Sequence, residues 1–194
     1  MIGLARERKF TLIELFQAVK NLLLKNGYEG FTFSILAEHL GVSRGTIYKY
    51  YANKDELITA FMIHELNAFL SELQYIDNYQ TFEDQFEFLM KQIFDRMNVH
   101  TFIEIGKQIN GKSNQRVKKN QEELEKLHLE MYRLLQNFIN LGKKEKVLKQ
   151  DIPDSLILAY IFQSLTIPNH FHVPKEEWNR HLKELIKYGL MKRE

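Results

Sequence analysis

Cysteine is absent from the 194-residue sequence, which also contains only three prolines and nine glycines. Without cysteine there is no disulfide, no thiolate nucleophile and no cysteine-ligated zinc or iron–sulfur site. So little proline and glycine excludes collagen-like and linker-dominated architectures. The longest apolar run, Leu156–Phe162, has seven residues, whereas a membrane-spanning helix needs about 20. We therefore expect a cytoplasmic protein without a membrane segment.

The residues that are present have the composition of a globular protein, with 44% hydrophobic and 27% charged side chains. The formal net charge is only +2. Residues 1–55, however, hold eight Lys and Arg against five Asp and Glu, whereas residues 56–194 hold 19 against 20. This weak basic excess favours an anionic partner for the N-terminal quarter.

Apolar residues recur at helical spacing along the chain, and no stretch shows the alternation and turn pairs of strands. The pattern predicts an all-α protein of about nine helices. Four are expected in the N-terminal part, at residues 11–25, between Thr32 and Gly41, at residues 44–51, and after Asn53, which pairs with Glu56 in a variant of the capping box. The other five are expected at residues 82–99, 102–110, 116–141, 153–167 and 175–190.

Residues 33–52, FSILAEHLGVSRGTIYKYYA, predict a helix-turn-helix. Ala37 lets the two short helices cross closely, Gly41 permits the tight turn, and Ile47 anchors the second helix in the core. Hydroxyl, phenol, ammonium and guanidinium groups remain on the outside of that second helix, where they suit base edges and phosphates. The outward residues are Arg44, Gly45, Thr46, Tyr48, Lys49 and Tyr50. By itself this shape is also common in all-α proteins that do not bind DNA. Basic residues on a short helix often only form its solvent-exposed face.

The stretch from Leu15 to Leu57 resembles the TetR family of bacterial transcriptional regulators. The matching motifs are Leu23-Leu24-Lys25-Asn26-Gly27-Tyr28, Thr32, Leu36-Ala37-Glu38, Gly41-Val42-Ser43-Arg44-Gly45-Thr46-Ile47-Tyr48, Tyr50-Tyr51 and Lys54-Asp55-Glu56-Leu57. The resemblance implies a three-helix DNA-binding domain at residues 1–55 and a helical ligand-binding and dimerisation domain at residues 56–194. It implies a cytoplasmic homodimeric repressor that a small apolar or amphipathic molecule releases from its operator. We expect no enzymatic activity and no cofactor.

The resemblance also assigns DNA contacts. Thr32 and Ser34 face the DNA backbone at the start of the second helix, and Lys54 holds a flanking phosphate. The recognition helix supplies Ser43, Arg44, Gly45, Thr46, Tyr48, Lys49 and Tyr50. Arg6, Arg8 and Lys9 form either an arm that adds charge near DNA or merely a soluble tail.

In the C-terminal domain we expect a ligand chamber and a dimer interface. Each chamber candidate is more often ordinary core than a ligand contact, and the two interface helices could instead be central core helices of a monomer. The chamber candidates are Phe86, Leu89, Ile93, Phe94, Met97, Phe102, Ile105, Ile109, His128, Met131, Leu135 and Phe138. The interface candidates are Leu158, Ile161, Phe162, Leu165, Leu182, Leu185 and Ile186.

Two other functions compete with a ligand-responsive repressor. A DNA-binding protein of the same fold could answer to a protein partner or to DNA geometry instead of a small molecule. An enzyme is disfavoured, because the sequence has no Gly-rich phosphate loop, Gly-x-Ser-x-Gly elbow or His-Glu-x-x-His helix. A metal site at His170 and His172 is also disfavoured, because no further ligands stand nearby in the sequence.

Overall fold

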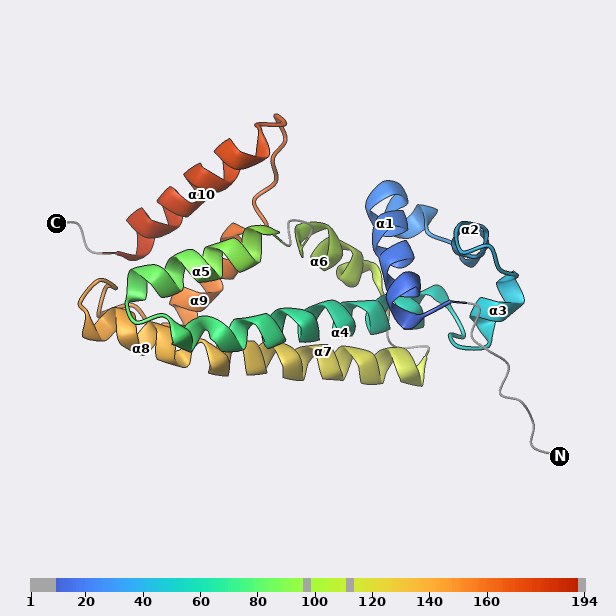
Figure 1. The fold of residues 1–194 in the computed structure, drawn as a ribbon, viewed down its shortest axis with the longest axis horizontal. Helices are drawn as coiled ribbons and strands as arrows, with labels where there is room; N and C mark the ends of the chain where they lie inside the picture. Colours follow the sequence, from blue (N-terminus) through green and yellow to red (C-terminus); the bar gives the residue numbers. More distant parts are fainter. Residues whose placement is uncertain (1–9, 96–98, 111–113, 192–194) are drawn as a thin grey trace. The chain divides into compact units, whose positions relative to one another are not determined.

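The computed structural model describes residues 10–95, 99–110 and 114–191, except for the side chains of residues 99 and 100. Within these ranges every regular element is a helix, and the strand-like pairing is limited to one isolated antiparallel bridge between Leu148 and Met191. The all-α prediction is therefore confirmed (Figure 1). The elements are α1 (Leu12–Gly30), α2 (Phe33–His39), α3 (Arg44–Tyr48), α4 (Lys54–Leu73), η1 (Gln74–Asn78), α5 (Phe82–Asp95), α6 (Val99–Gln108), α7 (Gln115–Leu134), α8 (Gln136–Lys144), α9 (Asp154–Ser164) and α10 (Lys175–Leu190).

Two compact units make up the chain, and each has a hydrophobic core of its own. The first unit is built from the described residues of Met1–Glu65 and Thr101–Leu124, and the second from those of Leu66–His100 and Glu125–Glu194. The first unit thus extends beyond the domain of residues 1–55 predicted from the sequence. It takes in the first part of α4, most of α6 and the first half of α7.

The core of the first unit includes residues far apart in the sequence. Ile47 of α3 and Leu57, Ile58 and Phe61 of α4 are buried in it with the inner face of α1. Three residues from beyond position 100 belong to the same cluster, namely Ile105, Ile109 and Val117. The helix-turn-helix therefore shares its core with the end of α6 and the start of α7.

Helix α1 begins at a capping box, in which the Thr11 hydroxyl accepts from the Glu14 N–H and the Glu14 carboxylate accepts from the Thr11 N–H. The predicted stop at Asn26-Gly27 is a kink, because Gly27 has φ +66° and the chain then resumes helical geometry as far as Gly30. The kink redirects the chain before the fully buried Phe31.

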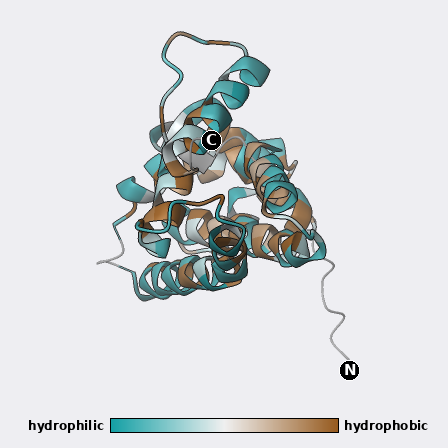
Figure 2. Ribbon diagram, turned by 90° about the vertical axis from the view of Figure 1, so that its left-hand side faces the viewer, coloured by the Kyte–Doolittle hydropathy of each residue, from teal (hydrophilic) through white to brown (hydrophobic). Residues whose placement is uncertain are grey.

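The core of the second unit is formed by α5, α8, α9, α10 and the end of α4. Helix α8 begins where the predicted helix of residues 116–141 breaks, because the fully buried Leu135 leaves helical geometry at φ −88° and ψ 1°. Gly142 of α8 lies against Phe82, and a Cβ built on Gly142 would come within 2.5 Å of that ring. Hydrophilic residues cover the outer sides of the helices, and apolar residues gather on their inner sides (Figure 2). Among the described residues, no helix has the length and hydropathy to cross a membrane.

Candidate nucleic-acid interface

The helix-turn-helix prediction is confirmed by the geometry of α2, α3 and the turn between them. Gly41 adopts φ +63°, a conformation that costs an L residue energy but not glycine. The turn closes where the Val42 N–H donates to the Ala37 carbonyl at 2.9 Å. Ala37 and Ile47 are both buried, so α3 is fixed by its inner residue and turns its other side chains outward.

The outer face of α3 carries the side chains expected to touch DNA. Arg44, Tyr48 and Lys49 are exposed, as is Ser43 at the N-cap. The Arg44 guanidinium lies 5.9 Å from the centre of the Tyr48 ring, and that ring packs edge-on against Phe33 at 4.9 Å. Tyr48 is thereby held in place while one side of it remains open to solvent.

Hydroxyl groups mark the starts of α2 and α3. Thr32 caps α2 by accepting from the Ile35 N–H at 3.3 Å. The hydroxyls of Ser43 and Thr46 lie 2.9 Å apart. Ser34 is exposed, and its Oγ lies 3.5 Å from Arg44 Nη1. The predicted contact residues of both helices thus lie close together on one side of the motif.

Gly45 has no neighbour that requires a glycine. A Cβ built on Gly45 would meet only Ser43 Oγ, at 3.9 Å, and the backbone conformation suits any residue. The helical penalty of about 1 kcal/mol for glycine relative to alanine therefore has no explanation within the chain.

Tyr50 and Lys54 are less open than expected. The half-buried Tyr50 ring packs edge-on against Phe10 at 5.9 Å. Lys54 Nζ donates to the Tyr28 carbonyl at 3.0 Å and lies 3.8 Å from the centre of the Tyr28 ring. In this structure Lys54 ties the end of α1 to the start of α4, so a phosphate would have to share it.

Tyr28 makes a second contact with the start of α4. Its hydroxyl donates to Asp55 Oδ1 at 2.7 Å. Burial, followed by the hydrogen bond and the negative charge of Asp55, raises the pKa of Tyr28 to about 12. The hydroxyl, the ring and the backbone carbonyl of Tyr28 therefore all hold α1 against α4.

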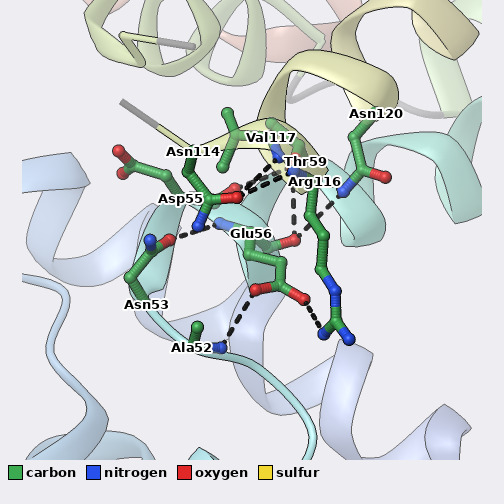
Figure 3. Close-up of polar contacts among 9 residues, drawn as sticks. All are labelled: Ala52, Asn53, Asp55, Glu56, Thr59, Asn114, Arg116, Val117 and Asn120. Atoms are coloured by element: carbon green, nitrogen blue, oxygen red, sulfur yellow. Dashed lines mark hydrogen bonds and ion pairs between the residues drawn. The ribbon is translucent and has the colours of Figure 1, made fainter. Parts of the chain in front are cut away.

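A buried carboxylate lies one residue further along α4 (Figure 3). The expected cap is present, since Asn53 Oδ1 accepts from the Glu56 N–H at 2.8 Å. The reciprocal bond of a capping box would reach the Asn53 N–H, but Glu56 Oε2 instead accepts from the Ala52 N–H at 3.0 Å. The other oxygen, Glu56 Oε1, accepts from Arg116 Nη1 at 2.8 Å.

The first turns of α7 hold this part of α4 by several contacts (Figure 3). Asn114 caps α7 by accepting from the N–H groups of Arg116 and Val117. Asn120 Nδ2 donates to Thr59 Oγ1 at 2.9 Å and to the Glu56 carbonyl at 3.4 Å. Sequence reasoning identified Asn53 and Glu56 as a cap but missed Arg116 and Asn120, because no local pattern links residues 60 positions apart.

The predicted chamber residues divide between the two cores. Ile105 and Ile109 are buried in the first unit, where Phe102 packs against Phe61 at 5.2 Å. His128 is an exposed residue of α7, and partial desolvation lowers its pKa. Met97 lies outside the described residues, as do Arg6, Arg8 and Lys9. The second unit's core holds Phe86, Leu89, Ile93, Met131, Leu135 and Phe138, with Phe94 packed against it.

Most of the predicted interface residues face the core of their own chain. Leu158, Ile161, Leu182 and Ile186 are buried, and Phe162 and Leu165 pack against that core. Of the seven candidates only Leu185 is exposed, with 59% of its surface accessible. The exposed apolar side chains of α9 and α10 are instead Leu156, Tyr160, Leu185 and Tyr188.

His170 and His172 are exposed residues of the connection between α9 and α10. Over the part of the chain that the structure describes, no three His, Asp or Glu residues are grouped so that they could hold a metal ion.

Comparison with known proteins identifies the family of the N-terminal region. Residues 15–61 match the profile of bacterial regulatory proteins of the TetR family. An uncharacterised helix-turn-helix-type transcriptional regulator of Haemophilus influenzae is 32% identical over 91 residues, which are 46% of this chain and 49% of that protein. This chain therefore spans about half the length of the curated relative it matches.

Solved structures share the fold over nearly the whole length. The regulator FadR of Bacillus subtilis, in complex with stearoyl-CoA, is 19% identical with a TM-score of 0.67, over 92% of this chain and 99% of its own. The ketosteroid regulator KstR2 of Mycobacterium tuberculosis is 16% identical with a TM-score of 0.68, over 98% of both chains. Residues 15–61 therefore carry the DNA-binding region of the TetR family of bacterial transcriptional regulators, and the chain as a whole shares the all-helical fold of these solved regulators.

Proposed function

We propose that this protein is a homodimeric transcriptional regulator in the cytoplasm that binds operator DNA and leaves it when a small molecule binds. The observation that carries the DNA-binding part is the outer face of α3. Of the α3 residues only Ile47, on the inner side, is buried. Arg44, Tyr48 and Lys49 are exposed, close in sequence to the hydroxyls of Ser43 and Thr46. These groups suit contacts with phosphates and base edges in the major groove.

Selection of duplexes from a random pool tests DNA binding without knowledge of the operator. We expect the wild-type protein to enrich one sequence with two related half-sites, whose centres lie about 34–36 Å or a multiple of that distance apart. Arg44→Ala should weaken binding to the selected duplex far more than binding to unselected DNA. A pool without enrichment, bound equally by both proteins, would overturn the proposal.

The dimer is supported by apolar surface on α9 and α10. Four large apolar side chains of these helices are exposed, namely Leu156, Tyr160, Leu185 and Tyr188. Exposed apolar surface of this kind favours contact with a partner protein. Because α9 and α10 are adjacent in the second unit, a second copy could cover both helices with the same two helices of its own, as a two-fold interface requires.

A ligand site in the second unit is supported by its core and by the ligands named for two structural relatives. Phe86 and Leu89 of α5 and Phe138 of α8 are buried in this core. Gln85 is buried there, and its Oε1 lacks a hydrogen-bond partner among the described residues, whereas its Nε2 donates to the Tyr79 carbonyl. The stearoyl-CoA of the FadR complex and the ketosteroid in the name of KstR2 combine apolar and polar parts. We propose an amphipathic effector whose donor group meets Gln85.

Thermal unfolding in the presence of fatty acyl thioesters and sterols tests for such an effector. A ligand that binds only the folded protein raises the melting temperature, and the same compound should weaken operator binding by the factor by which operator weakens ligand binding. Independent binding of ligand and operator would contradict the release mechanism and favour control by a protein partner or by DNA geometry.

A further inference from the structure

The first turn of α4 is fixed by contacts with three other parts of the first unit. Tyr28 of α1 binds Lys54 and Asp55. The Ala52 N–H, in the connection that follows α3, binds Glu56. The third contact, from Arg116 of α7 to the same Glu56 carboxylate, comes from 60 residues further along the chain.

Glu56 needs these partners because its side chain is only 6% exposed. A buried carboxylate loses the hydration of its charge and is tolerated when hydrogen bonds and an opposite charge replace that hydration. Its two oxygens are used separately, one by the Ala52 N–H and the other by the Arg116 guanidinium (Figure 3). The carboxylate is thus a bridge from the connection after α3 to α7.

Asn120 adds a second bridge one turn along both helices. Its side chain donates to the Thr59 hydroxyl and to the Glu56 carbonyl. Thr59 is itself buried and donates to the Asp55 carbonyl at 2.8 Å. Val117 is buried between these two polar positions of α7, so the contact combines apolar packing with directed hydrogen bonds.

We propose that Arg116 and Asn120 are positioning residues for DNA recognition, acting on α3 through Glu56 and Ala52 without touching DNA. The inference rests on the proposed DNA-binding function. Ala52 lies only four residues after Tyr48, the end of α3. Base readout depends on hydrogen bonds that fail when the reading helix is displaced, so a looser start of α4 lowers affinity for the correct sequence.

The test compares Arg116→Ala and Asn120→Ala with Lys119→Ala, which removes one exposed positive charge from the same turn of α7. Because 70% of the Arg116 side chain is exposed, water can take its place beside Glu56 when it is truncated, and circular dichroism would verify that the variant is folded. We expect Arg116→Ala to weaken binding to the selected duplex about tenfold and binding to random duplex much less. Lys119→Ala should leave both affinities nearly unchanged.

The salt dependence of binding separates positioning from direct contact. The slope of log affinity against log salt is negative, and removing a phosphate contact makes it shallower. Removing a positioning residue leaves the slope as in the wild type. Equal loss of affinity for selected and random duplexes with a reduced slope would make Arg116 a phosphate ligand and overturn the inference. Unchanged affinity in both Arg116→Ala and Asn120→Ala would overturn it as well.

A double-mutant cycle with Glu56→Gln tests the route through Glu56. If Arg116 acts through this carboxylate, the fold-loss of affinity in the double variant is smaller than the product of the fold-losses in the two single variants. A fold-loss equal to that product would contradict the route. The Arg116 and Asn120 variants decide the question alone if Glu56→Gln fails to fold. Failure of the proposed function is distinct from failure of this inference, since the wild-type protein would then select no duplex at all.

Discussion

At the scale of single residues, Gly45 is the position whose identity the chain itself does not require. Its Cβ position is open and its backbone conformation is ordinary. We predict that Gly45→Ala raises the free energy of unfolding by up to about 1 kcal/mol, because alanine favours the helix, and weakens operator binding, because the methyl group meets the wall of the groove. Urea unfolding and a binding titration measure the two effects. A variant that gains stability without losing affinity would show that DNA does not approach this backbone.

Lys49 is the exposed ammonium next to the recognition helix. We predict that Lys49→Ala reduces the magnitude of the slope of log affinity against log salt by about 0.9 for each phosphate that is no longer neutralised. Binding to unrelated duplexes should weaken to a similar degree, since phosphates carry no sequence information. Fluorescence anisotropy at several salt concentrations measures the slope, and a slope equal to that of the wild type would exclude a phosphate role.

Local patterns in the sequence were sufficient for the residues of the motif and insufficient for their distant partners. Gly41 and Ile47 follow from turn chemistry and helical spacing within a few positions, and the structure confirms both. Lys54 could be placed on the surface but not against Tyr28, since that contact spans 26 residues. Arg116 carried no signal, because an arginine at the start of a helix has the same local pattern whether it faces water or a buried acid.

At the scale of the elements, α1 and α4 are joined by an interaction that depends on pH. The pKa of Tyr28 is about 12 in the folded chain, against about 10 for an unperturbed tyrosine. The folded state therefore favours the protonated phenol, and this stabilisation is complete below pH about 10 and lost as the pH rises to about 12.

Tyr28→Phe should remove this part of the alkaline loss of stability. We expect the free energy of unfolding to fall less between pH about 10 and 12 in the variant than in the wild type. Tyr75→Phe, at an exposed tyrosine, is the matched control and should behave as the wild type does. Denaturant unfolding over this pH range gives the comparison, and parallel curves for Tyr28→Phe and wild type would contradict the assignment.

The periodicity of the elements predicted their number and type better than their inward faces. In Leu156–Phe162 every position is apolar, so spacing could not tell which residues face the core. The structure buries Ile157, Leu158 and Ile161 and leaves Leu156 exposed. The chamber candidates failed to form one group for a related reason, since an apolar stripe does not reveal which of two cores it joins.

At the scale of the whole molecule, the exposed residues of α9 and α10 define the expected dimer. We predict that Leu185→Glu, at a side chain with 59% of its surface accessible, yields a folded monomer, because a charge would be buried without a partner between two copies. The same change at the neighbouring Ile186, which is fully buried within its own chain, should instead unfold the subunit. Sedimentation velocity and circular dichroism distinguish the two outcomes, and a Leu185→Glu protein that remains dimeric would move the interface elsewhere.

The first unit is assembled from two separated stretches of the chain, and this gives its formation an order in time. A ribosome releases residues 10–65 well before residues 101–124, and at about 5–20 residues per second the interval lasts several seconds. During that interval the nascent helix-turn-helix lacks Ile105, Ile109 and Val117 over its core, and Glu56 has no arginine. A newly made subunit therefore completes its proposed DNA-reading surface late, when more than half of the chain has been synthesised, and a ribosome stalled before α7 would carry that surface unfinished.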